Sequence, residues 1–329
     1  MTGGRTPPPL RGRLPWWSRI LLVSGLVLFL FILTRESPGE VLDACTDVGP
    51  GIIVILAAPI ICYLLHTWGW LILIPGPRPR LGAALRAYVA SQALDELGGG
   101  VLGEPLKVFT VPGNDRTAGI ASVTLDNLSL LAALAVFMFL GGGVIAWLDV
   151  EAISFQRLGA AILVALGGVA MLGMLFFLGP GLAGRRLVRR FPGERLARFV
   201  ERYEEVARHN RAFLLRHPAR FVSSVGLHVL AKVWVVVEVW ITLEILGLYE
   251  PGRAVWLGLG KQAAQITGAP IPAQVGVFTG TLAFLGEALG MVGATALAVA
   301  LLRRARSLVW IGIGLGLVRG VVPPRTDPG

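Results

Sequence analysis

The sequence predicts an all-α protein: a polytopic transmembrane helix bundle of six to eight spans, with two re-entrant or broken segments. Three observations support this prediction. Hydrophobic residues make up 54% of the 329 residues, a larger apolar fraction than that of a soluble domain, and charged residues make up only 15%. Several apolar stretches approach or exceed the roughly 20 residues that a helix needs to cross a bilayer. Glycine and proline interrupt two further apolar segments, one in each half of the chain.

Five apolar stretches are predicted to span the membrane: residues 15–33, 49–74, 119–148, 158–179 and 221–249. No small-residue cleavage site follows the first stretch, so we interpret it as an uncleaved span. Residues 254–318 remain apolar, but "GAPIPAQVG" at 268–276 and "RRAR" at 303–306 interrupt them. The last third therefore contains at least one more span of less regular form.

Arginine positions predict the orientation, because short cytoplasmic loops of membrane proteins are enriched in Lys and Arg. Residues 1–14 form a basic tail, which places the N-terminus on the cytoplasmic side of the membrane. We expect one transmembrane domain over residues 15–318, with a first half at 15–148, a second half at 158–318 and a C-terminal tail at 319–329. The excess of basic over acidic residues thus reports membrane orientation, and no nucleic-acid partner is expected.

A basic segment between the halves, residues 183–220, is predicted to lie in the cytoplasm. Its residues 185–220 contain 11 arginines and 4 glutamates, and Leu196, Val200 and Tyr203 recur at helical spacing. This pattern is typical of an amphipathic helix at the membrane interface. Two interpretations remain open: a solvated loop that only sets the orientation, or a surface that contacts anionic lipid head groups.

The two interrupted regions, residues 81–118 and 252–290, occupy matching places in the order of spans. The first would enter the membrane from inside and the second from outside, which predicts an inverted-topology repeat. Irregular backbone at membrane depth must be buried in protein or line a cavity, so "GGGVLGEP" and "GAPIPAQVG" would face a cavity between the halves. Close helix packing by small residues and full hairpins giving eight crossings are the alternatives.

Ionisable residues inside apolar segments are candidate functional residues, since they are costly at membrane depth. Glu104 and Lys107 lie in the first interruption, Glu238 and Lys261 in the second half. Glu238 follows Lys232 by six positions, so the two should face different partners. The "RRAR" group would either mark the cytoplasmic end of a span, with a partial helix beyond it, or lie within a broken last span and hold a phosphate.

Motifs for catalysis and cofactors are not evident in the sequence. The four histidines form no pair with metal-ligand spacing, and "GGGVLGEPLK" lacks the Gly-Lys-Ser/Thr ending of a Walker A loop. The sequence therefore predicts no metal, no cofactor and no ATP site, and it favours a protein that is not an enzyme.

The interrupted regions, the arginine-rich segment and the final "LAVALLRRARSLVWIGIGLGLV" resemble the flippase-like membrane domain of lysylphosphatidylglycerol synthases and their stand-alone relatives. Within that group the chain looks most like hopanoid-biosynthesis-associated membrane proteins. Gly103, Glu104 and Lys107 match a Gly-Glu-basic pattern of the family, and Pro272 with Gly276 matches its Pro-x-x-x-Gly pattern. An arginine near the last span matches Arg303 or Arg304.

The chain also departs from the family pattern. Thr279 stands where the family usually has a glutamate, and Asp126 with Asn127 stands where a Glu-Arg pair is expected. These differences suggest a different or less charged substrate.

The resemblance implies movement of a lipid, either hopanoid, isoprenoid-linked or phospholipid, through a cavity between the halves. The expected substrate-binding residues are Glu104, Lys107, Glu238, Lys261, Gln265, Pro272, Thr279, Arg303 and Arg304. Membrane lipids are the expected partners, with lipid-biosynthesis enzymes as further candidates. A membrane-embedded lipid-modifying transferase, with Asp95, Glu96 or Glu104 as general base, and a scaffold for a lipid-synthesis complex are the alternatives.

Overall fold

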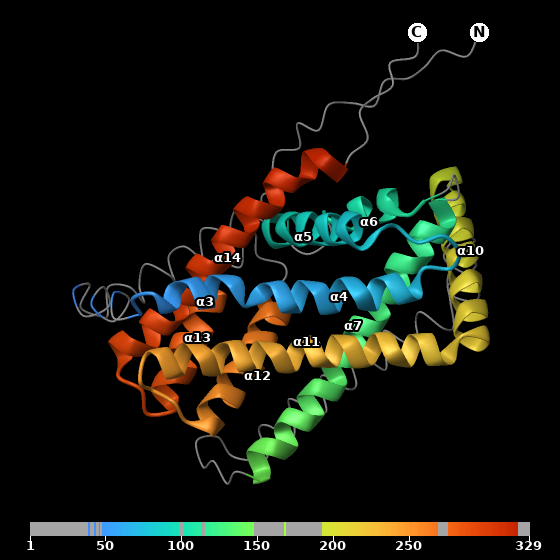
Figure 1. Cartoon of the computed structure of the whole chain (residues 1–329). Helices are drawn as coiled ribbons and strands as arrows, with labels where there is room; N and C mark the ends of the chain where they lie inside the picture. The colour runs from blue at the N-terminus through green and yellow to red at the C-terminus, as the bar shows by residue number, and fades with distance from the viewer. Residues whose placement is uncertain are drawn as a thin grey trace.

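The protein forms the helix bundle drawn in Figure 1, a computed structural model. It describes residues 48–98, 102–112, 116–147, 193–268 and 276–321, with residues 39, 43, 46 and 168 as isolated positions. Over these residues the structure is helical and contains no strand, which confirms the predicted all-α membrane bundle. The predicted spans 15–33 and 158–179 and both chain ends fall outside the described residues.

The helices follow one another closely along the chain. They are α3 (Gly51–Ala57), α4 (Pro59–Leu73), α5 (Leu81–Gly98), α6 (Glu104–Thr110), α7 (Arg116–Trp147), α10 (Glu194–Arg216), α11 (Pro218–Ile245), α12 (Pro251–Gly268), α13 (Val277–Ala288) and α14 (Gly293–Val321). Three stretches of the described chain are long and apolar enough to cross a membrane: Gly51–Leu73, Arg116–Val144 and Pro218–Ile245. These correspond to the spans predicted at 49–74, 119–148 and 221–249.

Both interrupted regions are built as helix, break, helix. In the first half α5 and α6 flank the break, and in the second half α12 and α13 do so. A glycine precedes the second helix each time. Gly276 has φ +80°, a conformation that glycine adopts without strain, whereas Gly103 is needed for space, since a Cβ there would lie 2.0 Å from the Ser91 carbonyl oxygen.

Packing between the halves is reciprocal. α4 and α11 pack together, α5 of the first half packs on α14 of the second, and α12 of the second half packs on α7 of the first. If α4 corresponds to α11, α5 to α12 and α7 to α14, the contact of α5 with α14 is the counterpart of the contact of α12 with α7. This is the arrangement expected of two corresponding halves, and Figure 1 shows α4 and α11 side by side between them.

The "RRAR" group is placed differently from both sequence interpretations. α14 is one continuous helix of 29 residues, with Arg303, Arg304 and Arg306 in its middle. The prediction of a span end with a partial helix beyond it is wrong, and so is the prediction of a break in the last span. The arginines are accommodated at this depth because other helices supply polar partners.

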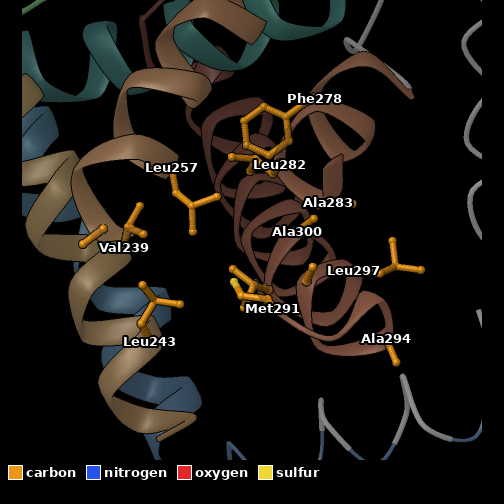
Figure 2. Packing of buried hydrophobic residues seen from close by; sticks show 13 residues of the cluster. Val239, Leu243, Leu257, Phe278, Leu282, Ala283, Met291, Ala294, Leu297 and Ala300 are labelled. Carbon is orange, nitrogen blue, oxygen red and sulfur yellow. The ribbon is translucent and has the colours of Figure 1, made fainter. Parts of the chain in front are cut away.

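An apolar cluster joins the helices of the second half. Figure 2 shows Val239 and Leu243 of α11 and Leu257 of α12 facing Phe278 and Leu282 of α13. Small residues of α14 complete the cluster: Ala294, Ala296 and Ala300 are nearly inaccessible. Alanine at these positions lets α13 and α14 approach closely, which is how membrane helices gain van der Waals contact.

The junction between α3 and α4 is stabilised by two tryptophans. Pro59 has no amide hydrogen, so it interrupts the helical hydrogen-bond ladder between α3 and α4. The Trp234 indole donates to the Ala58 carbonyl at 2.8 Å, and the Trp310 indole donates to the Leu56 carbonyl at 2.9 Å. α11 and α14 thus both hold this junction.

The arginine-rich segment contains α10, which lies against α7 and α11. Figure 1 shows it turned across the end of α11. Val200 and Phe213 are buried on its apolar side, as the predicted amphipathic pattern requires. Just beyond it, Arg220 donates to the carbonyls of Ile72 and Ile74, each at 2.8 Å, and so caps the C-terminal end of α4.

We expect Trp234→Phe and Trp310→Phe each to lower the free energy of unfolding by about 1 kcal/mol, because each removes one partly buried hydrogen bond while keeping an aromatic ring. Equilibrium unfolding in detergent measures the change. Trp240→Phe is the matched control, since that side chain is 45% exposed. Equal stability of all three variants would show that the tryptophans do not hold the junction.

Replacement of Gly103 by alanine should destabilise the protein by roughly 1 to 3 kcal/mol, the range for overpacking a filled site. Its new Cβ would collide with the backbone of Ser91, which cannot move aside as a flexible side chain can. Gly82→Ala in α5 serves as control, because a Cβ there meets nothing within 4 Å. A thermal shift as small as that of the control would contradict the close approach of α6 to α5.

Candidate functional site

A polar cavity of about 200 Å³ lies between helices of both halves, and we call it the central cavity. Its walls come from α4, α5 and α7 of the first half and from α11, α12, α13 and α14 of the second. The lining residues with polar side chains are Cys62, Tyr63, His66, Tyr88, Gln92, Glu96, Lys232, Glu238, Lys261, Gln262, Gln265, Arg304, Arg306, Ser307 and Trp310. A cavity this polar within a membrane bundle is a candidate binding site.

Helical spacing explains how the second half supplies its part of the lining. Lys232 and Val235 of α11 are three apart and fall on one face, and Glu238 continues that face. In α14, Arg306 and Trp310 are four apart and point the same way. Lys232 and Glu238 both border the central cavity, so their side chains do not point to different parts of the bundle. The expectation that they have different partners is confirmed.

Those partners are distinct. Lys232 Nζ donates to Gln262 Oε1 at 3.1 Å, whereas Arg306 Nη1 is paired with Glu238 Oε2. Arg303 Nη2 lies 3.6 Å from the same carboxylate oxygen. Glu238 and Arg303 are 3% and 1% exposed, so this ion pair is shielded from solvent.

Positive charge exceeds negative charge among the described lining residues. Lys232, Lys261, Arg304 and Arg306 provide four cations, against the carboxylates of Glu96 and Glu238, which leaves a formal charge of +2. Arg303 adds a further cation directly behind Glu238. The arrangement can therefore accept an anion with good donors, including the planar forks of arginine.

Aromatic and imidazole rings form another part of the lining. Tyr63 and Trp310 have ring centroids 4.9 Å apart, and His66 stacks on Tyr88 at 5.8 Å. His66 Nδ1 also lies 2.7 Å from His228 Nδ1, which is buried behind the cavity. These residues bring hydroxyl and imidazole groups to the cavity lining.

Four of the residues expected at a site border the central cavity: Glu238, Lys261, Gln265 and Arg304. Arg303 is buried next to it through Glu238. Thr279 of α13 is 2% exposed and is not part of the lining, although its neighbour Phe278 is. Pro272 lies outside the described residues.

Glu104 and Lys107 are not among the residues that line the central cavity. Glu104 borders a second cavity, of about 690 Å³, which is enclosed by α6, α7 and α10. Lys107 is fully buried, with its Nζ 2.9 Å from Glu104 Oε2 and 3.1 Å from Asp126 Oδ2. Neither residue lines the central cavity, although Lys107 Nζ lies 5.3 Å from the centre of the Tyr88 ring, which does.

Several lining residues were not expected at the site, among them His66, Tyr88, Gln92 and Ser307. The spacing of His66 from the other histidines indicates no metal site, and no group of three or more metal-ligating side chains occurs among the described residues. His66 contacts His228, which lies 162 positions away in the sequence, so no local sequence pattern predicts this contact. One usable signal was that α4 and α11 each carry a histidine within an apolar stretch.

The residues considered as general bases occupy different environments. Asp95 accepts hydrogen bonds from the Gly103 amide at 2.7 Å and from Ser91 at 3.3 Å, so it fixes the α5–α6 break. Glu104 is held by Lys107. Glu96 alone of the three borders the central cavity.

Comparison with known proteins identifies the family. The family model described as the lysylphosphatidylglycerol synthase TM region matches residues 16–316. No curated protein and no solved structure gives a significant match. Because the match covers nearly the whole chain, this protein is a membrane protein of the lysylphosphatidylglycerol synthase transmembrane-region family.

Proposed function

We propose that this protein moves a lipid with a phosphate-bearing head group across the membrane and holds that head group in the central cavity. The observation that carries the proposal is the excess of cationic side chains around an enclosed space in a membrane bundle. Unbalanced charges are costly in a low-dielectric setting, so an anion between Lys261, Arg304 and Arg306 would stabilise the cavity. Guanidinium and ammonium groups are the usual protein ligands of phosphate.

The size of the cavity supports a head group and not a whole lipid. Pockets for drug-sized molecules begin at about 300 Å³, whereas the central cavity measures about 200 Å³. The acyl or isoprenoid chains would stay in the bilayer, where they lose no hydrophobic stabilisation. Contributions from both halves to the lining agree with alternating access by movement of one half against the other.

The cationic lining also favours some of the expected lipids over others. A phospholipid or an isoprenoid-linked phosphate carries the required anion. An unphosphorylated hopanoid carries no anion to offset the formal charge of +2 of the lining. We therefore propose the phosphate-bearing classes as substrates, in a bacterial inner membrane with the N-terminus inside.

The experiment is reconstitution into liposomes with a fluorescent phosphatidylglycerol and an uncharged labelled diacylglycerol, followed by chemical quenching of the outer leaflet. We expect protein-dependent redistribution of the charged lipid. Lys261→Gln and Arg304→Gln should each reduce its initial rate at sub-saturating lipid about tenfold or more, because a charge-assisted hydrogen bond contributes roughly 1.5 to 3 kcal/mol and about 1.4 kcal/mol corresponds to tenfold.

Arg198→Gln is the matched control, because it also removes one arginine charge. Its side chain is 62% exposed on α10 and pairs with Glu194, away from the central cavity. Equal effects of all three substitutions would contradict the proposed site. Chemical conversion of the labelled lipid would instead indicate a transferase, and no redistribution of either lipid would favour a scaffold.

A further inference from the structure

A row of buried polar side chains leads away from the central cavity. His66 borders the cavity, its Nδ1 lies 2.7 Å from His228 Nδ1, and His228 Nε2 lies 3.0 Å from Asp126 Oδ1. Lys107 continues the row with its Nζ 3.1 Å from Asp126 Oδ2. Glu104 ends it at the second cavity, where its side chain is 22% exposed. We call these five residues the polar chain.

The middle of the polar chain is isolated from water. Lys107, Asp126 and His228 are each 0% exposed. Groups this deeply buried must satisfy one another, and here the contacts come from α4, α6, α7 and α11. The arrangement therefore fixes which nitrogen of each imidazole carries the hydrogen.

With Asp126 ionised, His228 donates its Nε2 hydrogen to Oδ1, which leaves His228 Nδ1 as an acceptor. His66 then donates from its own Nδ1, because two unprotonated nitrogens would not lie 2.7 Å apart. A neutral His66 in this state has an unprotonated Nε2 that can take up a proton. The formal charge of the polar chain is −1, from Glu104 and Asp126 against Lys107.

We propose that the polar chain stores one proton taken from the central cavity, and that this proton is linked to anion binding there. The proposal rests on the proposed function, since it assigns an energetic partner to the same cavity. Uptake at His66 Nε2 is accompanied by movement of the His66 Nδ1 hydrogen to His228 Nδ1 and of the His228 Nε2 hydrogen to Asp126 Oδ1. Both imidazoles remain neutral, Asp126 becomes neutral, and the polar chain changes from −1 to zero charge.

The change in charge is sufficient to link proton uptake by the polar chain to anion binding in the central cavity. Loss of the negative charge beside the cavity makes its potential more positive, which strengthens binding of an anion. By reciprocity, a bound anion strengthens proton uptake to the same degree. A head group would thus enter together with a proton and leave with it, which couples movement to a proton gradient.

Other ionisable groups face this end of the polar chain from every neighbouring helix. They are Cys62 and Tyr63 of α4, Tyr88 and Glu96 of α5, Lys232 and Glu238 of α11, Lys261 of α12, and Arg304 and Arg306 of α14. The carboxylates of Glu96 and Glu238 are the main competitors as proton acceptors, because the lysines and arginines of the lining already carry their protons. The test must therefore separate His66 from these carboxylates.

The test measures binding of phosphatidylglycerol to the full-length protein in nanodiscs of uncharged lipid, in weakly buffered solution with a pH indicator. Its phosphodiester does not titrate near neutral pH, so any proton taken up belongs to the protein. We expect net proton uptake on binding, approaching one per head group, and affinity that rises by up to about tenfold for each pH unit lowered. His66→Gln should abolish both effects, because glutamine can hydrogen-bond His228 but does not titrate.

His209→Gln is the matched control, since His209 is an exposed histidine of α10. Asp126→Asn is a second variant that should also abolish uptake, and a thermal unfolding scan shows whether it folds with Lys107 lacking this partner. Binding without proton uptake, or uptake unchanged in folded His66→Gln, would overturn the inference and leave the proposed function standing. Absence of phosphatidylglycerol binding to the wild type would overturn both.

Discussion

The structure depends on how its charged side chains are accommodated inside a bundle of apolar helices. Two buried carboxylates pair with several of these cationic side chains. Glu238 contacts Arg303 and Arg306 of α14. Asp126 contacts Lys107 of α6 and His228 of α11. Each joins at least two helices that are distant in sequence. Since removing one partner of a buried ion pair leaves an uncompensated charge, these contacts fix the positions of α6, α7, α11 and α14.

The central cavity follows from an imbalance within the same set of charges. Glu238 is shared by two arginines, and Lys232 is held by the uncharged Gln262, so the carboxylates that border the cavity cannot neutralise all its cations. In the polar chain, Lys107 is shared by two carboxylates, and the excess charge there is negative. The excess positive charge of the cavity lining supports phosphate binding there. The excess negative charge of the polar chain supports its uptake of a proton.

The sequence predicts the long apolar helices well because their pattern is local. Residues 49–74, 119–148 and 221–249 are recovered within a few positions, and the two breaks were indicated by glycine and proline. α14 was misinterpreted because its three central arginines look like a helix end, and the carboxylate that balances two of them is at Glu238, 68 positions from Arg306. The sequence does not predict the polar chain for the same reason, since the contacts of His228 with His66 and Asp126 join residues 162 and 102 positions apart.

Photo-crosslinking tests most directly whether the central cavity holds a lipid phosphate. A phosphatidylglycerol analogue with a photoreactive group beside its phosphate would be bound to the reconstituted protein, irradiated and mapped by mass spectrometry. The account predicts modified residues on α4, α12 and α14 around Cys62, Lys261 and Ser307, with loss of labelling when unlabelled phosphatidylglycerol competes. Labelling confined to the outward-facing residues of the bundle, such as Phe139 or Val222, would contradict it.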